Sequence, residues 1–306
     1  MNGHWRKLGR LFNPDSVLRH PKLASHAANP LPILINDDTY RIYFSGRDHK
    51  NRSSVGAVDI DILKQEIVQT YYDPFFIHGD ENSFFSEGIS IGCTCIAGDK
   101  TLMYFMGWKN CGSQHWFGEL GALEVHRDFS LSLLGSSPLL ALSAIDPISL
   151  SYPWVCHMVD GSFRMWYGST VTWDAGNGEM LHVIKSATSI DGLIWLNLKE
   201  TVPHIVGKAQ AFSRPTVCIN EDGSFDMWFS YRSGNGEPYR IGRAKSNDAT
   251  DWTLDLENPG INVSTSGWDS EMIEYPFVFK HKSETFMLYN GNGFGITGFG
   301  LAIWNP

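Results

Sequence analysis

The sequence contains no run of 18 apolar residues, and its first residues lack the apolar core of a secretory signal. We therefore expect no membrane span and no secretory signal peptide. The five cysteines are odd in number and lack the spacing of zinc ligands. This cysteine usage predicts no disulfide framework and no metal site, and it favours a reducing, cytoplasmic location.

Positive charge is also in short supply, because 24 Lys and Arg residues stand against 33 Asp and Glu residues, a formal net charge of -9. Proteins that bind nucleic acid through its phosphates present basic surfaces, so we expect no nucleic-acid partner. No segment keeps a sustained helical period. The sequence has no phosphate loop, dinucleotide-binding fingerprint or nucleophile elbow, and we expect no cofactor.

What the sequence does contain is a repeat. An aromatic segment recurs at steps of 60 to 62 residues, measured between equivalent Gly, Ser or Asn residues. An apolar segment and a polar turn precede each copy, and another apolar segment follows it, which is the pattern of consecutive β-hairpins. The five copies are RIYFSGRD (41–48), TLMYFMGWK (101–109), FRMWYGST (163–170), FDMWFSYR (225–232) and FMLYNGNG (286–293).

Two segments between these copies, SIDGLIW (189–195) and SNDATDW (246–252), indicate a turn into a fourth strand. Four antiparallel strands repeated five times predict an all-β fold, a five-bladed β-propeller, with residues 1–306 as a single domain. The alternative, a β-solenoid, has shorter repeats. The last repeat ends after its third strand, so we expect the N-terminal strand around 5–12 to close the last blade and cover its open edge.

Three cysteines, Cys95, Cys156 and Cys218, occupy the position that Leu34 and Val278 hold in the other repeats. A position filled by Leu, Val or Cys predicts a packing role.

In a propeller, the first strand of each blade lines the central channel, and its start lies at the same end as the end of the second strand. The residues at these places are polar, charged and aromatic, which favours a ligand site over a solvated channel mouth. We take the carboxylates Asp48, Glu87 and Glu274 as catalytic candidates. The substrate-binding candidates are His26, Asn29, Arg47, Trp108, Tyr152, Trp173, Arg214, Tyr231, Arg232, Tyr275, Asn290 and Asn292.

The chemistry of these candidates suggests a sugar. Paired carboxylates beside aromatic faces are typical of sites that bind a sugar and cleave its glycosidic bond. Guanidinium groups suit carboxylate or phosphate groups, so the sugar is expected to be acidic or phosphorylated. For each arginine–carboxylate pair, a purely structural ion pair is an equal alternative. His26 and His157 lack a second ligand at metal-binding spacing, which favours packed or hydrogen-bonded histidines over metal ligands. An ion held by oxygen ligands in the channel stays an open alternative.

The repeat, its aromatic second strands and the phrase S-x-D-G-x-x-W at 189–195 resemble the five-bladed β-propeller glycosidase superfamily. That superfamily includes arabinanases, xylosidases, invertase-like enzymes and mannoside phosphorylases. The last repeat, with the segments SEMIEYPFVF and MLYNGNGFGITGFGLA, is more similar to a less characterised branch of this superfamily. That branch includes propellers encoded near bacterial surface-polysaccharide genes. The same branch includes the N-terminal propeller of plant sphingolipid glycosyltransferases.

The resemblance implies a catalytic Asp before a proline in the first blade and a Glu at the start of the third blade. In this sequence those positions match Asn29 and Tyr152, whereas the second-blade carboxylate matches Glu87. An amide cannot accept a proton, so the standard inverting pair is absent. Two hypotheses remain: an enzyme that hydrolyses or otherwise processes a glycosidic bond, and a non-catalytic propeller that binds a small-molecule or oligosaccharide ligand in polysaccharide or glycoconjugate biosynthesis.

Overall fold

The computed structural model describes residues 3–110, 112, 115–200, 202–234 and 236–306, and strands dominate these ranges. Three separate four-stranded antiparallel sheets are present in this part of the chain. In spatial order, their strands are β1 (His4–Phe12), β20 (Phe299–Asn305), β19 (Glu284–Asn290) and β18 (Glu274–His281); β10 (Leu150–His157), β11 (Phe163–Thr172), β12 (Leu181–Ser189) and β13 (Leu196–Glu200); and β14 (Ser213–Ile219), β15 (Phe225–Tyr231), β16 (Arg240–Ser246) and β17 (Trp252–Asp255).

A larger sheet contains the remaining strands, and it divides into two antiparallel groups of four. A single parallel pair, Ser53 with Gly88, joins the two groups. The first group contains β2 (Ser25–Asn36), β3 (Thr39–Arg47), β4 (Ser53–Asp61) and β5 (Glu66–Thr70), and the second contains β6 (Gly88–Ala97), β7 (Lys100–Lys109), β8 (Phe117–Val125) and β9 (Leu131–Leu133).

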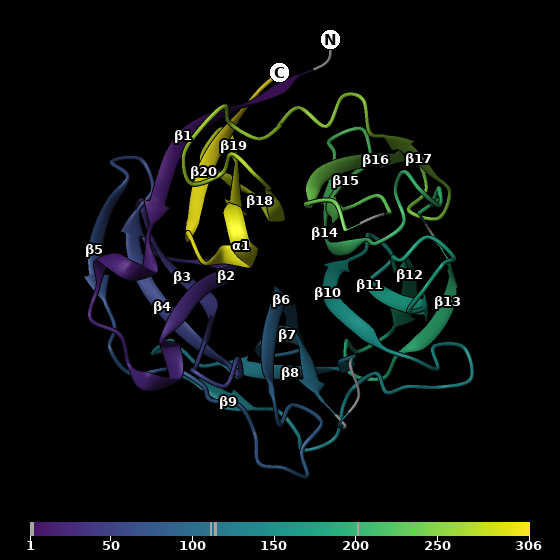
Figure 1. The fold of residues 1–306 in the computed structure, drawn as a ribbon, viewed down its shortest axis with the longest axis horizontal. Coiled ribbons are helices and arrows are strands. Elements are labelled where there is room, and N and C mark those ends of the chain that lie inside the picture. Colours follow the sequence, from purple (N-terminus) through teal and green to yellow (C-terminus); the bar gives the residue numbers. More distant parts are fainter. Residues whose placement is uncertain (1–2, 111, 113–114, 201, 235) are drawn as a thin grey trace.

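The sheets are arranged around a central axis, as expected for a propeller (Figure 1). The first strands, β2, β6, β10, β14 and β18, lie nearest the axis, and each contacts the next until β18 contacts β2. The short helical segments are η1 (Pro14–Ser16), η2 (Pro21–Leu23) and α1 (Asn292–Gly295). Within the described ranges, the structure contains no helix of the length and apolar character that a membrane crossing requires.

The N-terminal strand completes the last sheet, which confirms the prediction for residues 5–12. β1 pairs antiparallel with β20, and Trp5 lies opposite Trp304. Trp5 is buried, and its ring packs edge-on against Trp228 and Trp304, with centroids 5.5 and 5.0 Å away. The two ends of the chain therefore share one sheet, and the otherwise open edge of β20 is covered.

The aromatic second strands form much of the core, because their side chains are covered on both faces of the sheets. Met165, Trp166 and Tyr167 are all fully buried. The four cysteines in the described ranges are free, and Cys93 is buried among apolar side chains. Burial raises the pKa of the Cys156 thiol to about 12, as expected for a packing cysteine. The fifth cysteine, Cys111, lies outside the described residues.

Candidate functional site: a polar cavity at the centre of the ring

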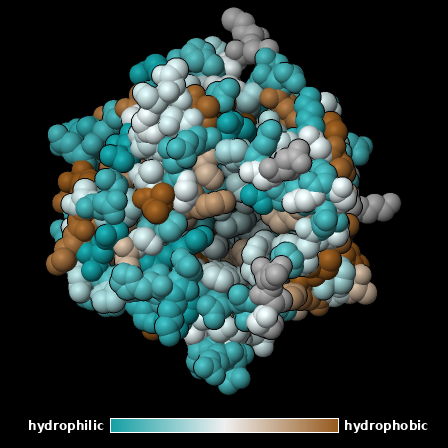
Figure 2. Space-filling view, in the orientation of Figure 1, coloured by the Kyte–Doolittle hydropathy of each residue, from teal (hydrophilic) through white to brown (hydrophobic). Residues whose placement is uncertain are grey.

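A cavity of about 320 Å³ opens at the centre of the ring, where Figure 2 shows a hollow in the molecular surface. Its wall contains residues from each of the five groups of strands and their flanking loops. Six of the residues expected at the site from the sequence line this wall: Asn29, Arg47, Trp108, Tyr152, Arg232 and Tyr275. Sequence reasoning missed other lining residues, among them Ser53, Trp116, Ser151, His182 and Tyr239.

Four of these five residues, all except Ser151 of the first strand β10, share a position that could have identified them. A third strand runs antiparallel to the second strand, so it begins at the end of the blade where the second strand finishes. Ser53 begins β4, His182 is the second residue of β12, and Tyr239 directly precedes β16. The starts of the third strands therefore contribute to the cavity as much as the two places considered from the sequence.

A repeated distortion of the first strands turns side chains toward the axis. In four of these strands a residue directly before a proline has a positive φ angle, in a region that non-glycine residues rarely occupy. The strand pairing changes register at each of these places, as at a β-bulge. The residues and their φ angles are Asn29 (56°), Tyr152 (36°), Arg214 (43°) and Tyr275 (54°).

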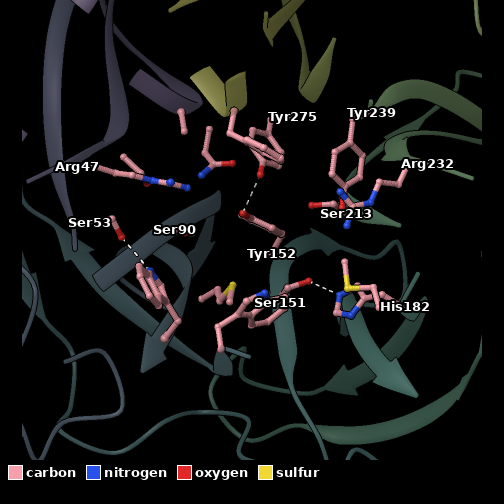
Figure 3. A pocket seen from close by; sticks show the side chains of 18 residues that line it. Arg47, Ser53, Ser90, Ser151, Tyr152, His182, Ser213, Arg232, Tyr239 and Tyr275 are labelled. Atoms are coloured by element: carbon pink, nitrogen blue, oxygen red, sulfur yellow. Dashed lines mark hydrogen bonds between the residues drawn. The ribbon is translucent and has the colours of Figure 1, made fainter. Parts of the chain in front are cut away.

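Two arginines line the cavity from opposite sides, with Tyr152 and Tyr275 between them (Figure 3). Arg232 pairs with the buried carboxylate of Glu179, with 2.6 Å between Nε and Oε2, and its guanidinium lies 5.0 Å from the centre of the Tyr239 ring. Arg47 forms no ion pair with any residue that the structure describes. The guanidinium of Arg47 is therefore available to an anionic ligand.

Glu274 is fully buried, and neither of its carboxylate oxygens has a hydrogen-bond partner within the described part of the chain. Burial raises the pKa of Glu274 well above its usual value, although the positive charges of Arg47 and Arg232 oppose this shift. Tyr275, the next residue, lines the cavity. The site therefore has a buried carboxyl group with a raised pKa close to its wall, within the electrostatic reach of both cavity arginines.

The opposite part of the wall contains a short chain of uncharged polar groups. The Nε2 atom of His182 lies 2.6 Å from the hydroxyl oxygen of Ser151, and its Nδ1 atom lies 2.8 Å from that of Thr170. Burial lowers the pKa of His182 to about 3, so the ring is neutral at pH 7. The ring of Trp116 packs edge-on against His182, with 5.9 Å between centroids.

Three candidates have structural contacts in place of a free side chain, so the structure corrects their predicted role in substrate binding. Arg214 is 1% exposed and donates to the backbone carbonyls of Pro30, Gly92 and Tyr275 at 2.7 to 3.3 Å. The amide of Asn290 is fully buried and bonds to the backbone of residues 27, 29 and 298. Asn292 likewise accepts from two backbone N–H groups and donates to a carbonyl.

Two further corrections concern adjacent residues where a second strand ends, because only one residue of each pair lines the cavity. Arg47 lines the cavity, whereas Asp48 is buried in the following turn, where it pairs with Arg52 at 2.8 Å. Arg232 lines the cavity, whereas Tyr231 lines a separate surface cavity together with Arg240.

The remaining candidates lie near the cavity but are not part of its wall. Glu87 is partly buried, and its backbone pairs with Ser53 and Trp108. His26 lies in a small neighbouring pocket, where burial first and Arg47 second lower its pKa to about 4. Trp173 packs edge-on against Trp116 at 5.3 Å and so supports a residue that does line the cavity.

No family model matches the chain. Two Mycobacterium tuberculosis proteins, Uncharacterized protein MT1551 of strain CDC 1551 / Oshkosh and Uncharacterized protein Rv1502 of strain ATCC 25618 / H37Rv, are each 42% identical to it over 303 residues. The match covers 98% of this chain and 98% of each relative. The chain belongs to the family of these two proteins.

The chain has the fold of the glycoside hydrolase-like propellers, because solved structures of that kind superpose on almost the whole of it. A glycosyl hydrolase from Bacteroides ovatus has a TM-score of 0.71 at 13% identity and covers 100% of this chain and 91% of its own. A structure from a study of β-1,2-mannoside-targeting hydrolases in the GH130 family of mannoside phosphorylases has a TM-score of 0.72 at 13% identity. The match covers 100% of this chain and 95% of that structure's chain. A thermostable family-43 glycoside hydrolase has a TM-score of 0.65 at 15% identity, and the match covers 92% of this chain and 88% of the hydrolase. The resemblance stated from the sequence is thus confirmed for the fold.

Proposed function

We propose that the chain is a carbohydrate-active propeller that binds a sugar with an anionic group in its central cavity and acts on a glycosidic bond of that sugar. The observation that carries the proposal is the placement of Arg47 and Arg232 on opposite sides of one cavity lined by aromatic residues. Guanidinium groups bind carboxylate and phosphate groups in pairs of hydrogen bonds. Aromatic rings such as Trp108 and Trp116 offer flat apolar faces to a sugar ring.

The chemical step requires a proton donor, and Glu274 has the properties of one. Burial raises the pKa of its carboxyl group, which is the way the general acid of a glycosidase is made able to hold its proton. Glu274 is fully buried and is not among the cavity-lining residues, so the proposal requires a rearrangement of the wall that brings its carboxyl group into contact with the ligand. Asp48 and Glu87, the other carboxylates taken from the sequence, are not on the wall, and we no longer propose Asp48 as a catalytic group.

A specific observation favours a second candidate function, that of a non-catalytic sugar-binding propeller. Among the cavity-lining residues of the described chain, none has a carboxyl group. Inverting and retaining glycosidases use two carboxyl groups that flank the bond. A cavity with arginines, hydroxyl groups and aromatic rings can bind a sugar without cleaving it.

Titration calorimetry tests the binding proposal. The probes are glucose 1-phosphate, mannose 1-phosphate, galactose 1-phosphate and glucuronic acid, and the matched variants are Arg47→Met in the cavity and Arg10→Met on the outer strand β1. We expect one probe or more to bind the wild type, and Arg47→Met to weaken binding about 10-fold, since bonds to charged groups are worth roughly 1.5–3 kcal/mol. Arg10→Met should bind like the wild type. Absence of binding by all four probes would refute both candidate functions.

Turnover separates the two candidates. An oligosaccharide panel is incubated with the protein, with and without inorganic phosphate, so that hydrolysis and phosphorolysis are both detected. If the protein is an enzyme, Glu274→Gln should lower turnover about 10²–10⁴-fold and leave binding in place, because Gln has nearly the same shape but donates no catalytic proton. Binding without turnover on the whole panel supports the non-catalytic candidate.

The proposal includes the finer architecture. We propose that the five groups of four strands are five blades of a single domain formed by residues 1–306, with the larger sheet counted as two blades. The single residue pair between its two halves supports this division. We also propose a cytoplasmic location, which the free cysteines of the described ranges support.

A further inference from the structure

One part of the cavity wall holds three uncharged polar side chains that contact one another. His182 comes from the third strand β12, Ser151 from the first strand β10 and Thr170 from the second strand β11, so one sheet holds all three. Ser151 and His182 line the cavity, whereas Thr170 lies behind them and is 1% exposed. Figure 3 shows the bond between Ser151 and His182 at the lower edge of the cavity.

The contacts leave the imidazole two ways to share its proton. In a neutral ring one nitrogen donates and the other accepts. If Nε2 carries the proton, it donates to Ser151, Thr170 donates to Nδ1, and the Ser151 hydroxyl is free to donate to a ligand. If Nδ1 carries the proton, it donates to Thr170, Nε2 accepts from Ser151, and Ser151 can only accept from a ligand.

No nearby charge fixes the choice. Ser151 and Thr170 are neutral, and no carboxylate contacts the ring within the described residues. Trp116 shields one side of the ring with an apolar surface. A hydroxyl group of a sugar is itself a donor and an acceptor, so its chemistry matches a partner that can take either role.

We propose that Ser151, His182 and Thr170 form an uncharged relay that recognises one hydroxyl group of the bound sugar, with Ser151 as the contact and His182 and Thr170 as positioning residues. This inference rests on the proposed function, because it assumes a sugar in the cavity. It adds a specificity element, since a buried site arranged to bond a hydroxyl group rejects an analogue that lacks it.

The relay can first be tested without a ligand, by measuring the ¹⁵N chemical shifts of the His182 ring. Thr170→Val removes the partner of Nδ1, and a buried N–H group without an acceptor is rare, so the proton should move to Nε2. Ser151→Ala removes the partner of Nε2, so the proton should move to Nδ1. The matched control is Ser186→Ala on the same strand β12, because the buried Ser186 hydroxyl has no partner among the described residues. A ring whose tautomer is the same in all three variants and the wild type would overturn the relay.

The second arm uses the tightest of the four probes named above, together with its monodeoxy analogues. We expect one deoxy position to weaken binding to the wild type about 10-fold or more, and the same position to matter less than about 2-fold in Ser151→Ala. Thr170→Val should lower the affinity of the complete sugar about 3–10-fold, although Thr170 does not line the cavity.

The outcomes distinguish the relay from the proposed function. If the sugar binds but its deoxy analogues have the same penalties in the wild type, Ser151→Ala and Thr170→Val, the relay is wrong and the proposed function stands. If none of the four probes binds the wild type, the proposed function fails and the inference fails with it, whatever the tautomers do.

Discussion

The hydroxyl group of Tyr152 donates a hydrogen bond to that of Tyr275 at 3.2 Å on the cavity wall, and the two rings lie 5.3 Å apart. Both residues precede a proline in a first strand and have positive φ angles. Backbone strain of this kind costs of order 1–3 kcal/mol for each residue and persists only where the surrounding structure holds it. Three of the four strained residues before prolines, Asn29, Tyr152 and Tyr275, line the cavity, which indicates that the fold gives up stability there to build the site. The fourth, Arg214, instead bonds to backbone carbonyls.

Asn29→Gly tests this relation between strain and function. Glycine adopts a positive φ angle without the steric cost, and the change also removes the Asn29 side-chain oxygen, which is buried without a partner among the described residues. We expect the free energy of unfolding to stay within about 0.5 kcal/mol of the wild type or to rise, while sugar binding weakens. Urea unfolding and calorimetry measure the two effects. A loss of several kcal/mol would contradict the idea that Asn29 is strained for the sake of the site.

Arg214→Met should destabilise the fold, in contrast with what its position in the sequence suggested. The guanidinium links the fourth group of strands to carbonyls of Pro30, Gly92 and Tyr275, which belong to three other groups. Burial lowers the pKa of Arg214 to about 9, so the group is still charged at pH 7, and its replacement by Met removes the donor of three backbone carbonyls. We expect the free energy of unfolding to fall by roughly 2–4 kcal/mol. Arg47→Met, in the cavity, should change the free energy of unfolding by less than about 1 kcal/mol. Equal losses in the two variants would contradict the assignment of Arg214 to the fold and Arg47 to the site.

The repeat made the fold predictable from the sequence, because equivalent residues in successive units occupy equivalent places. It located the strands, the closing role of β1 and the wall residues Arg47 and Arg232. The repeat could not decide which of two adjacent residues faces the axis. Arg232 and Tyr231 are neighbours, but the pleat of the strand sends them to different cavities.

The site was less predictable, because its contacts join residues far apart in the chain. The partners of Arg214 lie 61 to 184 residues away from it, and they are backbone carbonyls, which no side-chain pattern reveals. His182 was missed because only the starts of first strands and the ends of second strands were considered. Its partner Ser151 lies 31 residues earlier and meets it only because β10 and β12 flank β11.

Trp5→Ala tests the closure of the last sheet. The Trp5 ring fills the space between Trp228 and Trp304, and its backbone N–H donates to Gly260 at 2.8 Å. Truncation of a buried tryptophan typically costs about 3–5 kcal/mol, so we expect a loss of that size in thermal or urea unfolding. The control is His4→Ala, one residue earlier and exposed, which should leave stability nearly unchanged. A small loss in Trp5→Ala would mean that β1 is dispensable.

Glu274→Gln should change how stability depends on pH. In the unfolded chain this carboxyl group loses its proton near its usual pKa of 4.5, whereas burial keeps the proton on in the folded chain until a much higher pH. The stability that the protonated group contributes is therefore complete below pH 4.5 and is lost as the pH rises through the raised pKa, at a slope of about 1.4 kcal/mol per pH unit.

Gln cannot ionise, so unfolding curves recorded from pH 5 to pH 8 should show the variant gaining stability relative to the wild type as the pH rises. The exposed residue Glu284, replaced by Gln, is the matched control, and its stability should follow that of the wild type across the range. Parallel curves for the wild type and Glu274→Gln would mean that Glu274 is already ionised in the folded protein. In that case it would neutralise Arg47 and Arg232, and it could not serve as the proton donor.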